Sequence, residues 1–420
     1  MNRAKISGLA LSFMLLGAAH ASAGQKIITF DSSLRSADRA AGVESLGGKI
    51  TKDLHIIDAV VAVFPDNVKE PAINSLRGVR SVEEDLYLKW IEEWTLPQSC
   101  APNGHDSINK TPAALPLSCV TDGLDRIKAV GSWTPEQLPA PETPVITPEE
   151  KEVPWGVKRV NAPGVWDTTM GEGVKVAVID TGMDYNHPDL KDVYAGGYNA
   201  IVSTNPPLDD QGHGTHVSGT IAAVRDAKGV VGVAPGVRLY AVKVLDAHGS
   251  GSYSNIVDGI QWAVDNKMQV INMSLGGGSG TPALQKALAA ADKAGVTIVC
   301  AAGNDSGPVN YPAKYPQAIA VSASDPSDKL ASFSSRGAEI AFIAPGVNIP
   351  STYKDSAYKT MSGTSMASPH VAGLAAIAVA GGADTPAKVR AALTKAASSL
   401  GMKPTEEGAG MIDAAKLASR

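Results

Sequence analysis

Apolar and polar positions along the chain repeat with different periods, and they divide it into two folded parts. Between residues 25 and 90, short apolar runs alternate with helical patterns, and Gly47-Gly48 marks a turn. The predicted elements are strands at 26–30, 49–54, 56–64 and 79–90, and helices at 36–46 and 68–76. This β-α-β-β-α-β order is typical of a small ferredoxin-like α+β unit. An unrelated small α+β module is the alternative.

From residue 153 onward, apolar strands alternate with helical stretches. The strands are β-branched and apolar on both faces, as expected when helices cover both sides of a parallel sheet. They are predicted at 174–179, 238–244, 268–273, 296–301 and 318–322, with helices at 254–266 and 281–294. This alternation predicts an α/β fold with a doubly wound, mostly parallel sheet. Asp180 follows the first of these strands, at the carboxyl edge where such sheets place their sites.

The first 23 residues have the pattern of an export signal. Arg3 and Lys5 precede an apolar run that ends at Ala19, and Ala21-Ser22-Ala23 offers a small-x-small cleavage site. An uncleaved membrane anchor is the alternative, but the run is short for a bilayer. We therefore expect a signal peptide at residues 1–23 and a secreted, extracellular protein.

Prolines interrupt residues 91–150, which predicts a linker or insert without long helices or central strands. Cys100 and Cys119 lie within it and could pair, because an exported protein matures where disulfides persist. Cys300 lies in an apolar run instead, where we expect a buried, unpaired thiol.

Composition excludes some classes of function. The formal net charge of −5 and the absence of a long basic block argue against a nucleic-acid partner. The apolar fraction of 44% is typical of a globular protein with a packed core. We expect no membrane association once the signal is removed.

Three glycine-flanked segments carry the candidate chemistry. A serine at the start of an Ala-rich helix is exposed to the positive end of the helix dipole, but it needs a base and an orienting acid to become a nucleophile. The segments are Val178-Ile179-Asp180-Thr181-Gly182, Gly212-His213-Gly214-Thr215-His216-Val217-Ser218-Gly219 and Gly363-Thr364-Ser365-Met366-Ala367-Ser368-Pro369-His370. Taken singly, an Asp after a strand or a His beside glycines is usually only a cap or loop residue.

Together, in the order Asp, His, Ser, the three segments resemble the subtilisin-like serine proteases, which are the standard example of that order. The resemblance implies that His213 takes the proton of Ser365, and that Asp180 orients and stabilises the imidazole. Ala301-Ala302-Gly303-Asn304 resembles the family segment whose asparagine side chain helps to form the oxyanion hole. The implied activity is hydrolysis of peptide bonds through an acyl-enzyme intermediate.

The resemblance also implies a substrate cleft between two glycine-rich edges. An extended peptide would pair with the backbone of these edges, and side-chain pockets would supply selectivity. The implied substrate-binding residues are Gly249, Ser250, Gly251, Tyr253, Ser274, Leu275, Gly276 and Asn310. Asn310 would form an uncharged floor of the first specificity pocket, which predicts broad specificity with a preference for large apolar residues before the cut.

A structural calcium site is implied by the same resemblance. Its ligands would be the carboxylates of Asp189 and Asp226 with the backbone carbonyls of Val224, Lys228 and Val230, because Ca²⁺ prefers hard oxygen ligands from a flexible loop. No cofactor is expected for catalysis.

The expected organisation is a signal peptide (1–23), an inhibitory and chaperone propeptide (24–90), a Pro-rich insert (91–150) and a subtilisin-like catalytic domain (151–420). The propeptide would act as an intramolecular inhibitor of a monomeric enzyme whose partners are protein and peptide substrates. Autoprocessing near residue 90 and near residue 150 both fit the sequence. Two other functions stay open, which are a non-enzymatic binding protein on this scaffold and an inhibitor of other proteases formed by residues 25–90.

Overall fold

The computed structural model describes residues 24–91, 153–226 and 228–417. The predicted signal peptide, the Cys100–Cys119 pair and most of the Pro-rich insert lie outside the described residues. Within the described ranges, no helix has both the length and the apolar character needed to cross a membrane. Cys300 is a buried free thiol, as predicted.

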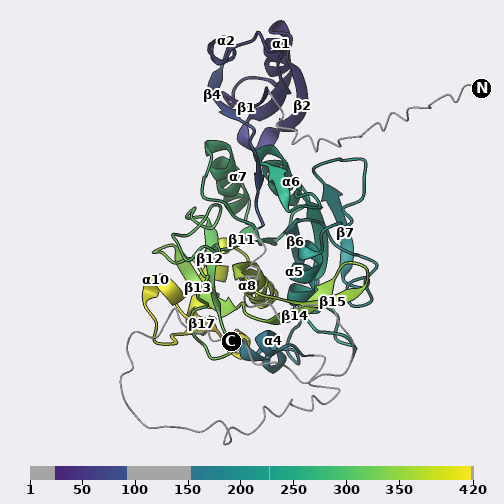
Figure 1. The fold of residues 1–420 in the computed structure, drawn as a ribbon, viewed down its shortest axis with the longest axis vertical. Helices are drawn as coiled ribbons and strands as arrows, with labels where there is room; N and C mark the ends of the chain where they lie inside the picture. Colours follow the sequence, from purple (N-terminus) through teal and green to yellow (C-terminus); the bar gives the residue numbers. More distant parts are fainter. Residues whose placement is uncertain (1–23, 92–152, 227, 418–420) are drawn as a thin grey trace, which may run out of the picture.

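The N-terminal unit is a four-stranded sheet with two helices, drawn in purple at the top of Figure 1. Its elements are β1 (Gln25–Phe30), α1 (Ser36–Ser45), β2 (Lys49–Leu54), β3 (Ala59–Val63), α2 (Glu70–Asn74) and β4 (Val79–Glu84). The strands lie in the order β2-β3-β1-β4 and pair antiparallel. This element order is the one the sequence predicts, although residues 55–57 form a short 3-10 helix instead of continuing a strand.

Apolar side chains on the two central strands of this unit, β1 and β3, point alternately to opposite faces of the small sheet, so both faces are apolar. Ile28 and Val60 point into a small core shared with Val43 and Ile73 of the two helices. Their neighbours Ile27 and Val61 belong instead to the core that this unit shares with the larger unit. Because strand side chains alternate between faces, the small sheet is covered on both sides.

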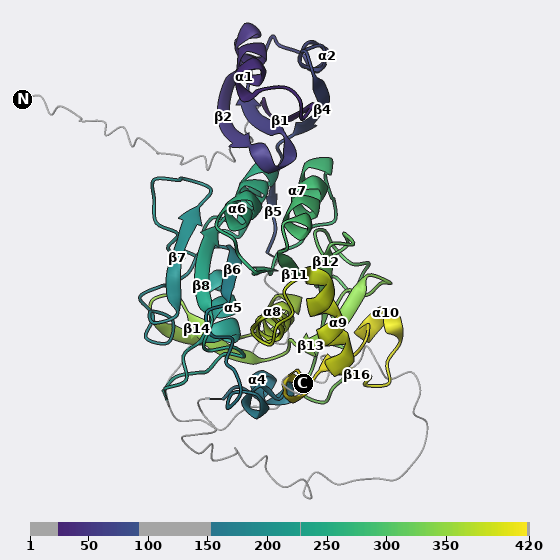
Figure 2. The same ribbon diagram turned by 180° about the vertical axis from the view of Figure 1, so that it is seen from behind.

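The prediction of one strand from 79 to 90 is wrong. β4 ends at Glu84, and a separate strand β5 (Tyr87–Lys89) pairs antiparallel with β9 (Ser250–Ser252) of the larger unit. The break lies at Asp85, whose carboxylate accepts hydrogen bonds from the Ser254 amide at 2.8 Å and the Ser254 hydroxyl at 2.6 Å. In Figure 2, β5 lies between α6 (Tyr253–Asp265) and α7 (Pro282–Lys293) as it leaves the small unit.

The larger unit is built on a nine-stranded sheet, which confirms the doubly wound α/β prediction. Every neighbouring pair is parallel except β16 and β17. In spatial order the strands are β16 (Ala397–Ser398), β17 (Met411–Ile412), β13 (Ile340–Pro345), β12 (Ala318–Ser324), β11 (Thr297–Ala301), β10 (Val270–Met273), β6 (Lys175–Asp180), β8 (Arg238–Lys243) and β7 (Tyr194–Asn199).

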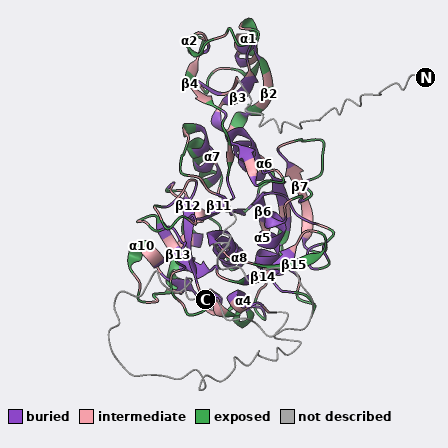
Figure 3. Cartoon of the chain, viewed as in Figure 1, coloured by how far each residue is buried: buried purple, intermediate pink, exposed green. Residues whose placement is uncertain are grey.

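Helices cover both faces of this sheet, and its central strands are buried (Figure 3). The main helices are α5 (His213–Ala222), α6 (Tyr253–Asp265), α7 (Pro282–Lys293), α8 (Thr364–Ala380) and α9 (Pro386–Ala396). On β6, Val176 and Val178 face the layer of α5 and α8, whereas Ala177 and Ile179 face the layer of α6 and α7. The shorter α4 (Trp155–Arg159) and α10 (Pro404–Glu407) and the hairpin of β14 (Ile349–Tyr353) and β15 (Ala357–Met361) complete the unit.

Candidate active site

Asp180 and His213 form a buried pair at the carboxyl edge of the sheet. Asp180 is the last residue of β6 and is fully buried, and His213 is the first residue of α5. The Nδ1 atom of His213 lies 2.8 and 3.0 Å from the two carboxylate oxygens of Asp180. Because a carboxylate only accepts, Nδ1 carries the proton in this pair, which leaves Nε2 of a neutral imidazole able to accept a proton.

Ser365 lies in the first turn of α8, where free backbone N–H groups give the helix its positive end. Its hydroxyl donates to the backbone carbonyl of Ser274 at 3.1 Å, and the Ser274 hydroxyl donates back to the Ser365 carbonyl at 2.8 Å. This reciprocal pair fixes the candidate nucleophile against the predicted substrate edge.

The hairpin β14–β15 joins the helix of the base to the helix of the nucleophile. His216, on α5, has its Nε2 atom 3.0 Å from the carbonyls of both Ile349 and Lys359. On the same side, Ser351 donates to the His216 carbonyl and Thr352 donates to the Thr215 carbonyl, each at 2.8 Å. The chain then passes directly from this hairpin into α8, which packs against α5. The three catalytic residues predicted from sequence therefore lie on elements that are packed and bonded together.

Asn304 lies beside the start of α8 with its side-chain amide held in one orientation. Its Oδ1 accepts hydrogen bonds from the Thr364 amide at 2.8 Å and from the Thr364 hydroxyl at 2.9 Å. With the oxygen engaged in this way, the Nδ2 group is the end available to the cavity that Asn304 and Ser365 both line. This is the arrangement that an oxyanion donor requires.

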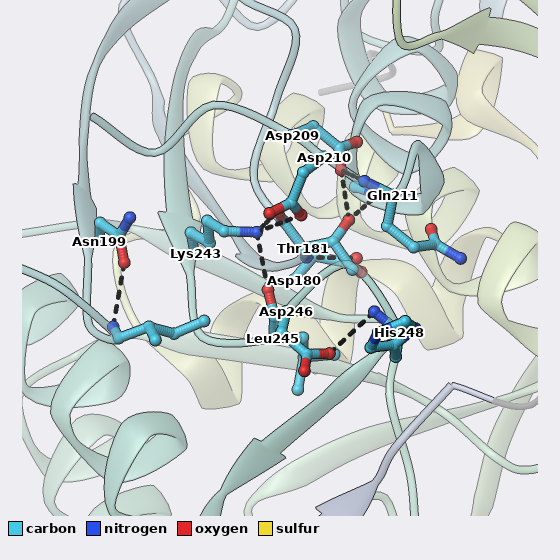
Figure 4. A network of polar contacts seen from close by, with 12 residues as sticks. Asp180, Thr181, Asn199, Asp209, Asp210, Gln211, Lys243, Leu245, Asp246 and His248 are labelled. Carbon is cyan, nitrogen blue, oxygen red and sulfur yellow. Dashed lines mark hydrogen bonds and ion pairs between the residues drawn. The ribbon is translucent and has the colours of Figure 1, made fainter. Parts of the chain in front are cut away.

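A polar network that includes Thr181, Asp209 and Lys243 lies beside Asp180 (Figure 4), and these three residues were not among the site residues predicted from the sequence. The buried Asp209 carboxylate accepts from the Thr181 hydroxyl at 2.8 Å, the Gly212 amide at 2.8 Å and the Thr215 hydroxyl at 2.6 Å. Burial opposes ionisation of Asp209, but hydrogen bonds from Thr215 and from backbone amides outweigh it and hold its pKa below the ordinary value. The Thr181 hydroxyl in turn accepts from the Gly214 amide at 2.9 Å. The strand end and the helix start are thus tied together through one carboxylate.

Lys243 completes the network from β8, where it is the parallel partner of Asp180. Its buried ammonium donates to the Thr181 carbonyl at 2.6 Å, the Leu245 carbonyl at 2.9 Å and the Asp210 carboxylate at 2.7 Å. The available signals in the sequence were the Asp209-Asp210 pair shortly before His213 and a lysine at the end of a mostly apolar strand.

The predicted substrate edges are occupied by the end of the N-terminal unit. A cavity of about 340 Å³ is lined by residues 88–91 together with Gly276, Asn304, Asn310 and Ser365. The backbone amide of Trp90 donates to the Gly249 carbonyl at 2.9 Å, and the Gly276 amide donates to the Trp90 carbonyl at 3.0 Å. Residues of both predicted edges therefore bond one extended segment.

The residues expected to bind calcium also lie together. The buried Asp189 carboxylate accepts from the Val230 amide and from the Tyr358 hydroxyl, each at 2.9 Å. The Val224 amide donates to the Asp189 carbonyl, and the Asp226 side chain accepts from the Lys228 amide. Burial and the nearby Asp189 raise the pKa of Tyr358. Among the described residues, no three or more Asp, Glu, His or Cys side chains are arranged to hold a metal ion.

A model of the subtilase family matches residues 171–411, a range that contains all four predicted catalytic residues. The chain belongs to the subtilase family. It is 51% identical over 234 residues to subtilisin amylosacchariticus from Bacillus subtilis subsp. amylosacchariticus, 49% identical to M-protease from Shouchella clausii strain KSM-K16 and 50% identical to subtilisin from Bacillus pumilus.

These alignments cover only part of each protein. They include 54–55% of this chain, and they span 61% of the length of the first two relatives and 84% of the third. The residues of the N-terminal unit lie outside the range that matches the subtilase model. The family is therefore shown for the larger unit.

Two fully buried histidines, His216 on α5 and His370 on α8, lie on the helices that carry the candidate base and nucleophile. Burial lowers the pKa of His370 to about 4, and burial, with a smaller electrostatic contribution from His213, lowers the pKa of His216 to about 3. The His370 Nδ1 atom lies 2.8 Å from the Met366 carbonyl, one turn earlier on α8. Between the folded pKa of each group and pH 6.5, the imidazole is mostly neutral in the folded state but mostly protonated in the unfolded chain.

We expect acid to destabilise the fold through these groups. A folded pKa below the unfolded value of 6.5 means that the unfolded chain binds more protons below pH 6.5, so stability present at neutral pH is lost as the pH falls. For His370 the loss by pH 4 is on the order of 2–3 kcal/mol. The test compares denaturant midpoints of a Ser365→Ala parent chain and of the same chain carrying His370→Asn, each measured from pH 7.5 to 4.5. The midpoint should fall less steeply with decreasing pH in the His370→Asn chain, whose amide keeps a donor for the Met366 carbonyl. His248→Gln, at an exposed position, is the control, and identical slopes for all three chains would contradict the assignment.

Proposed function

We propose that this protein is a serine endopeptidase that cuts peptide bonds through an acyl-enzyme. The observation that carries the proposal is the hydrogen bond between Asp180, at the end of β6, and His213, at the start of α5. The β14–β15 hairpin ties α5 to the helix that presents Ser365 beside the Asn304 amide. The Ser365 hydroxyl attacks the substrate carbonyl while its proton passes to Nε2 of His213. That proton then goes to the leaving amine, and water repeats the sequence to release the acid.

Charge develops at two atoms during this reaction. The imidazolium formed on His213 is stabilised by the Asp180 carboxylate, which also fixes the tautomer. The oxyanion receives hydrogen bonds from Nδ2 of Asn304 and from backbone N–H groups at the start of α8. Both sets of groups are held in place before substrate arrives, so little reorganisation is needed.

Measurements of kcat with a chromogenic peptide should distinguish the roles of the nucleophile, the orienting acid and the oxyanion donor, because substitution of each should lower kcat by a different factor. Ser365→Ala should lower kcat by about 10⁶-fold, Asp180→Asn by about 10⁴-fold and Asn304→Leu by roughly 10²–10³-fold. Subtilisin and trypsin are the worked examples of these magnitudes. KM should change little for Asn304→Leu, because the oxyanion contact is made only in the transition state. Full activity of Asp180→Asn would contradict the proposed mechanism.

We also propose that residues 24–91 act as an intramolecular inhibitor in an exported, self-processed zymogen. Strand addition by β5 and the backbone bonds of Trp90 support this role, because they fill the cleft as an extended substrate would. Outside the cleft, Lys52 bonds Asp258 at 2.9 Å, and the side chain of Gln261 donates to the Asp53 carbonyl at 2.9 Å. The N-terminal pattern of residues 1–23 supports export.

Processing should occur shortly after Ile91 and not near Glu150. Residues 88–91 line the same cavity as Ser365. The peptide bond that the nucleophile attacks is therefore expected a few residues after them in the sequence. N-terminal sequencing of the mature enzyme tests this position. A Ser365→Ala chain expressed alone should remain uncut, and a mature terminus near residue 150 would favour the other position.

Broad specificity is proposed from Asn310, an uncharged side chain in the lining of the cavity beside Ser365. Its backbone amide is fixed by the Ala302 carbonyl at 2.8 Å. Large apolar residues before the cut are the expected preference.

Calcium binding is proposed for the loop around Asp189. The two donors to this buried carboxylate, the Val230 amide and the Tyr358 hydroxyl, are both neutral, and a buried anion is stabilised by a cation. The carboxylates of Asp189 and Asp226 and the carbonyls of Val224, Lys228 and Val230 would hold the ion. Its contribution would be to stability.

Calcium should raise the thermal midpoint of the Ser365→Ala chain by several degrees, and magnesium should raise it less, because the smaller ion keeps its water more tightly. Asp226→Asn should weaken this response, since it removes one charged ligand from an exposed part of the loop. Asp192→Asn, at an exposed position before β7, serves as the control for charge alone. An unchanged calcium response in Asp226→Asn would exclude this side chain as a ligand.

A further inference from the structure

The peptide group between Gln211 and Gly212 lies one residue before His213, the proposed general base. Gly212 is the last residue before α5, and its backbone has a positive φ of 111°. Because glycine adopts both signs of φ at little cost, a peptide group next to it rotates more easily than one between two residues with side chains. The start of α5 therefore keeps one geometry only if contacts from other segments fix this peptide group.

Hydrogen bonds hold both sides of the 211–212 peptide group. The Gly212 amide donates to the buried Asp209 carboxylate at 2.8 Å, and the Tyr353 hydroxyl donates to the Gln211 carbonyl at 3.0 Å. The N–H and C=O of one trans peptide group point in opposite directions, so Asp209 and Tyr353 hold it from opposite sides. The Gln211 side chain adds a third contact, because its Oε1 accepts from the His213 amide at 2.7 Å.

The ring of Tyr353 is also fixed against the start of α5. A Cβ added to Gly212 would lie 2.3 Å from Cζ of this ring, so the ring occupies the space that a side chain would take there. The Lys359 ammonium lies over the ring, 4.6 Å from its centroid. Tyr353 ends β14, and its neighbour Thr352 donates to the Thr215 carbonyl of α5 at 2.8 Å. The tyrosine hydroxyl is thus brought to its acceptor by a strand that is itself bonded to α5.

We propose that Tyr353 is a positioning residue for His213, acting through the 211–212 peptide group. The imidazole must keep Nδ1 on the Asp180 carboxylate while Nε2 exchanges a proton with the reacting groups, so a rotation of the backbone just before it displaces the base. Without the tyrosine hydroxyl, the carbonyl side of the peptide group loses its contact and the group is held from one side alone. The proposal rests on the peptidase function proposed above and adds to it a residue outside the nucleophile, base, acid and oxyanion donor.

Tyr353→Phe tests the hydroxyl alone, because it keeps the ring against Gly212. In enzyme matured from the full chain, kcat per active site should fall roughly five- to tenfold, the effect of losing one neutral hydrogen bond. The active sites are counted by titration with a serine-directed phosphonate. KM should change little, since Tyr353 lies outside the segments that line the cavity at Ser365.

Tyr240→Phe is the matched control for this substitution. Tyr240 is half-buried on β8, and its ring also borders a glycine, Gly196. Its loss of a hydroxyl should leave kcat per active site unchanged. A tyrosine that only stabilised the fold would change the number of active sites and not the turnover of each. An unchanged kcat per titrated site in Tyr353→Phe would therefore overturn the proposal.

A second measurement needs neither maturation nor catalysis. Gln211-Gly212 is the only Gln-Gly pair in the sequence, so carbonyl-¹³C glutamine with ¹⁵N glycine gives one NMR signal for this peptide group in the full-length Ser365→Ala chain. In Tyr353→Phe on that chain, the Gly212 amide hydrogen should exchange with water roughly five- to tenfold faster, since rotation of the group breaks its bond to Asp209.

Tyr240→Phe on the same chain should leave this exchange rate unchanged. Equal exchange rates in the Tyr353→Phe and parent chains would overturn the proposal. Absence of turnover in the unsubstituted enzyme would instead contradict the peptidase function, and the NMR comparison would still test the contact that Tyr353 makes.

Discussion

A fully buried carboxylate at the end of a parallel strand is the constraint on which this site depends. Asp180 has no access to water, so its charge must be balanced by groups that the fold delivers. The Thr181 amide donates to one oxygen at 2.7 Å, and the His213 imidazole donates across both. An imidazolium at His213 therefore forms beside an anion that is already dry and oriented. In the proposed mechanism the pair depends on this desolvation, because the same ion pair at a surface would be weak.

The surrounding network of hydrogen bonds fixes the position of the Asp180 carboxylate relative to His213 and to the substrate edge. Lys243 bonds the carbonyls of Thr181 and Leu245, and so connects the segment after Asp180 with the segment that leads to the substrate edge. Asp209 connects the same segment with the first turn of α5 (Figure 4). Each tie is a charge-assisted hydrogen bond in a buried place, where geometry is strict. A shift of the base relative to the substrate edge would break several of them at once.

The sequence could predict the fold class, and it could nominate the candidate catalytic residues whose elements the structure packs together, because both depend on local patterns. Apolar runs at the central strands and glycine-flanked polar residues at their ends are readable without distant contacts. Other elements were not readable in this way. The strand β7 contains two glycines and a half-buried surface, and β16 and β17 are only two residues long, so their pairing depends on the finished sheet. Asp209 and Lys243 also look like ordinary surface charges until the fold buries them.

The division at Asp85 shows why residues 79–90 could not be assigned from their period alone. A continuous strand would satisfy the local apolar pattern, but Asp85 and Glu83 meet the N-termini of two helices in the other unit, α6 and α7. Burial raises the pKa of both carboxyls, so part of the favourable interaction with the helix ends is offset by desolvation. These contacts therefore contribute more to orientation than to affinity. They direct the chain away from the small sheet and into the cleft, where backbone pairing by β5 and the Trp90 contacts hold it.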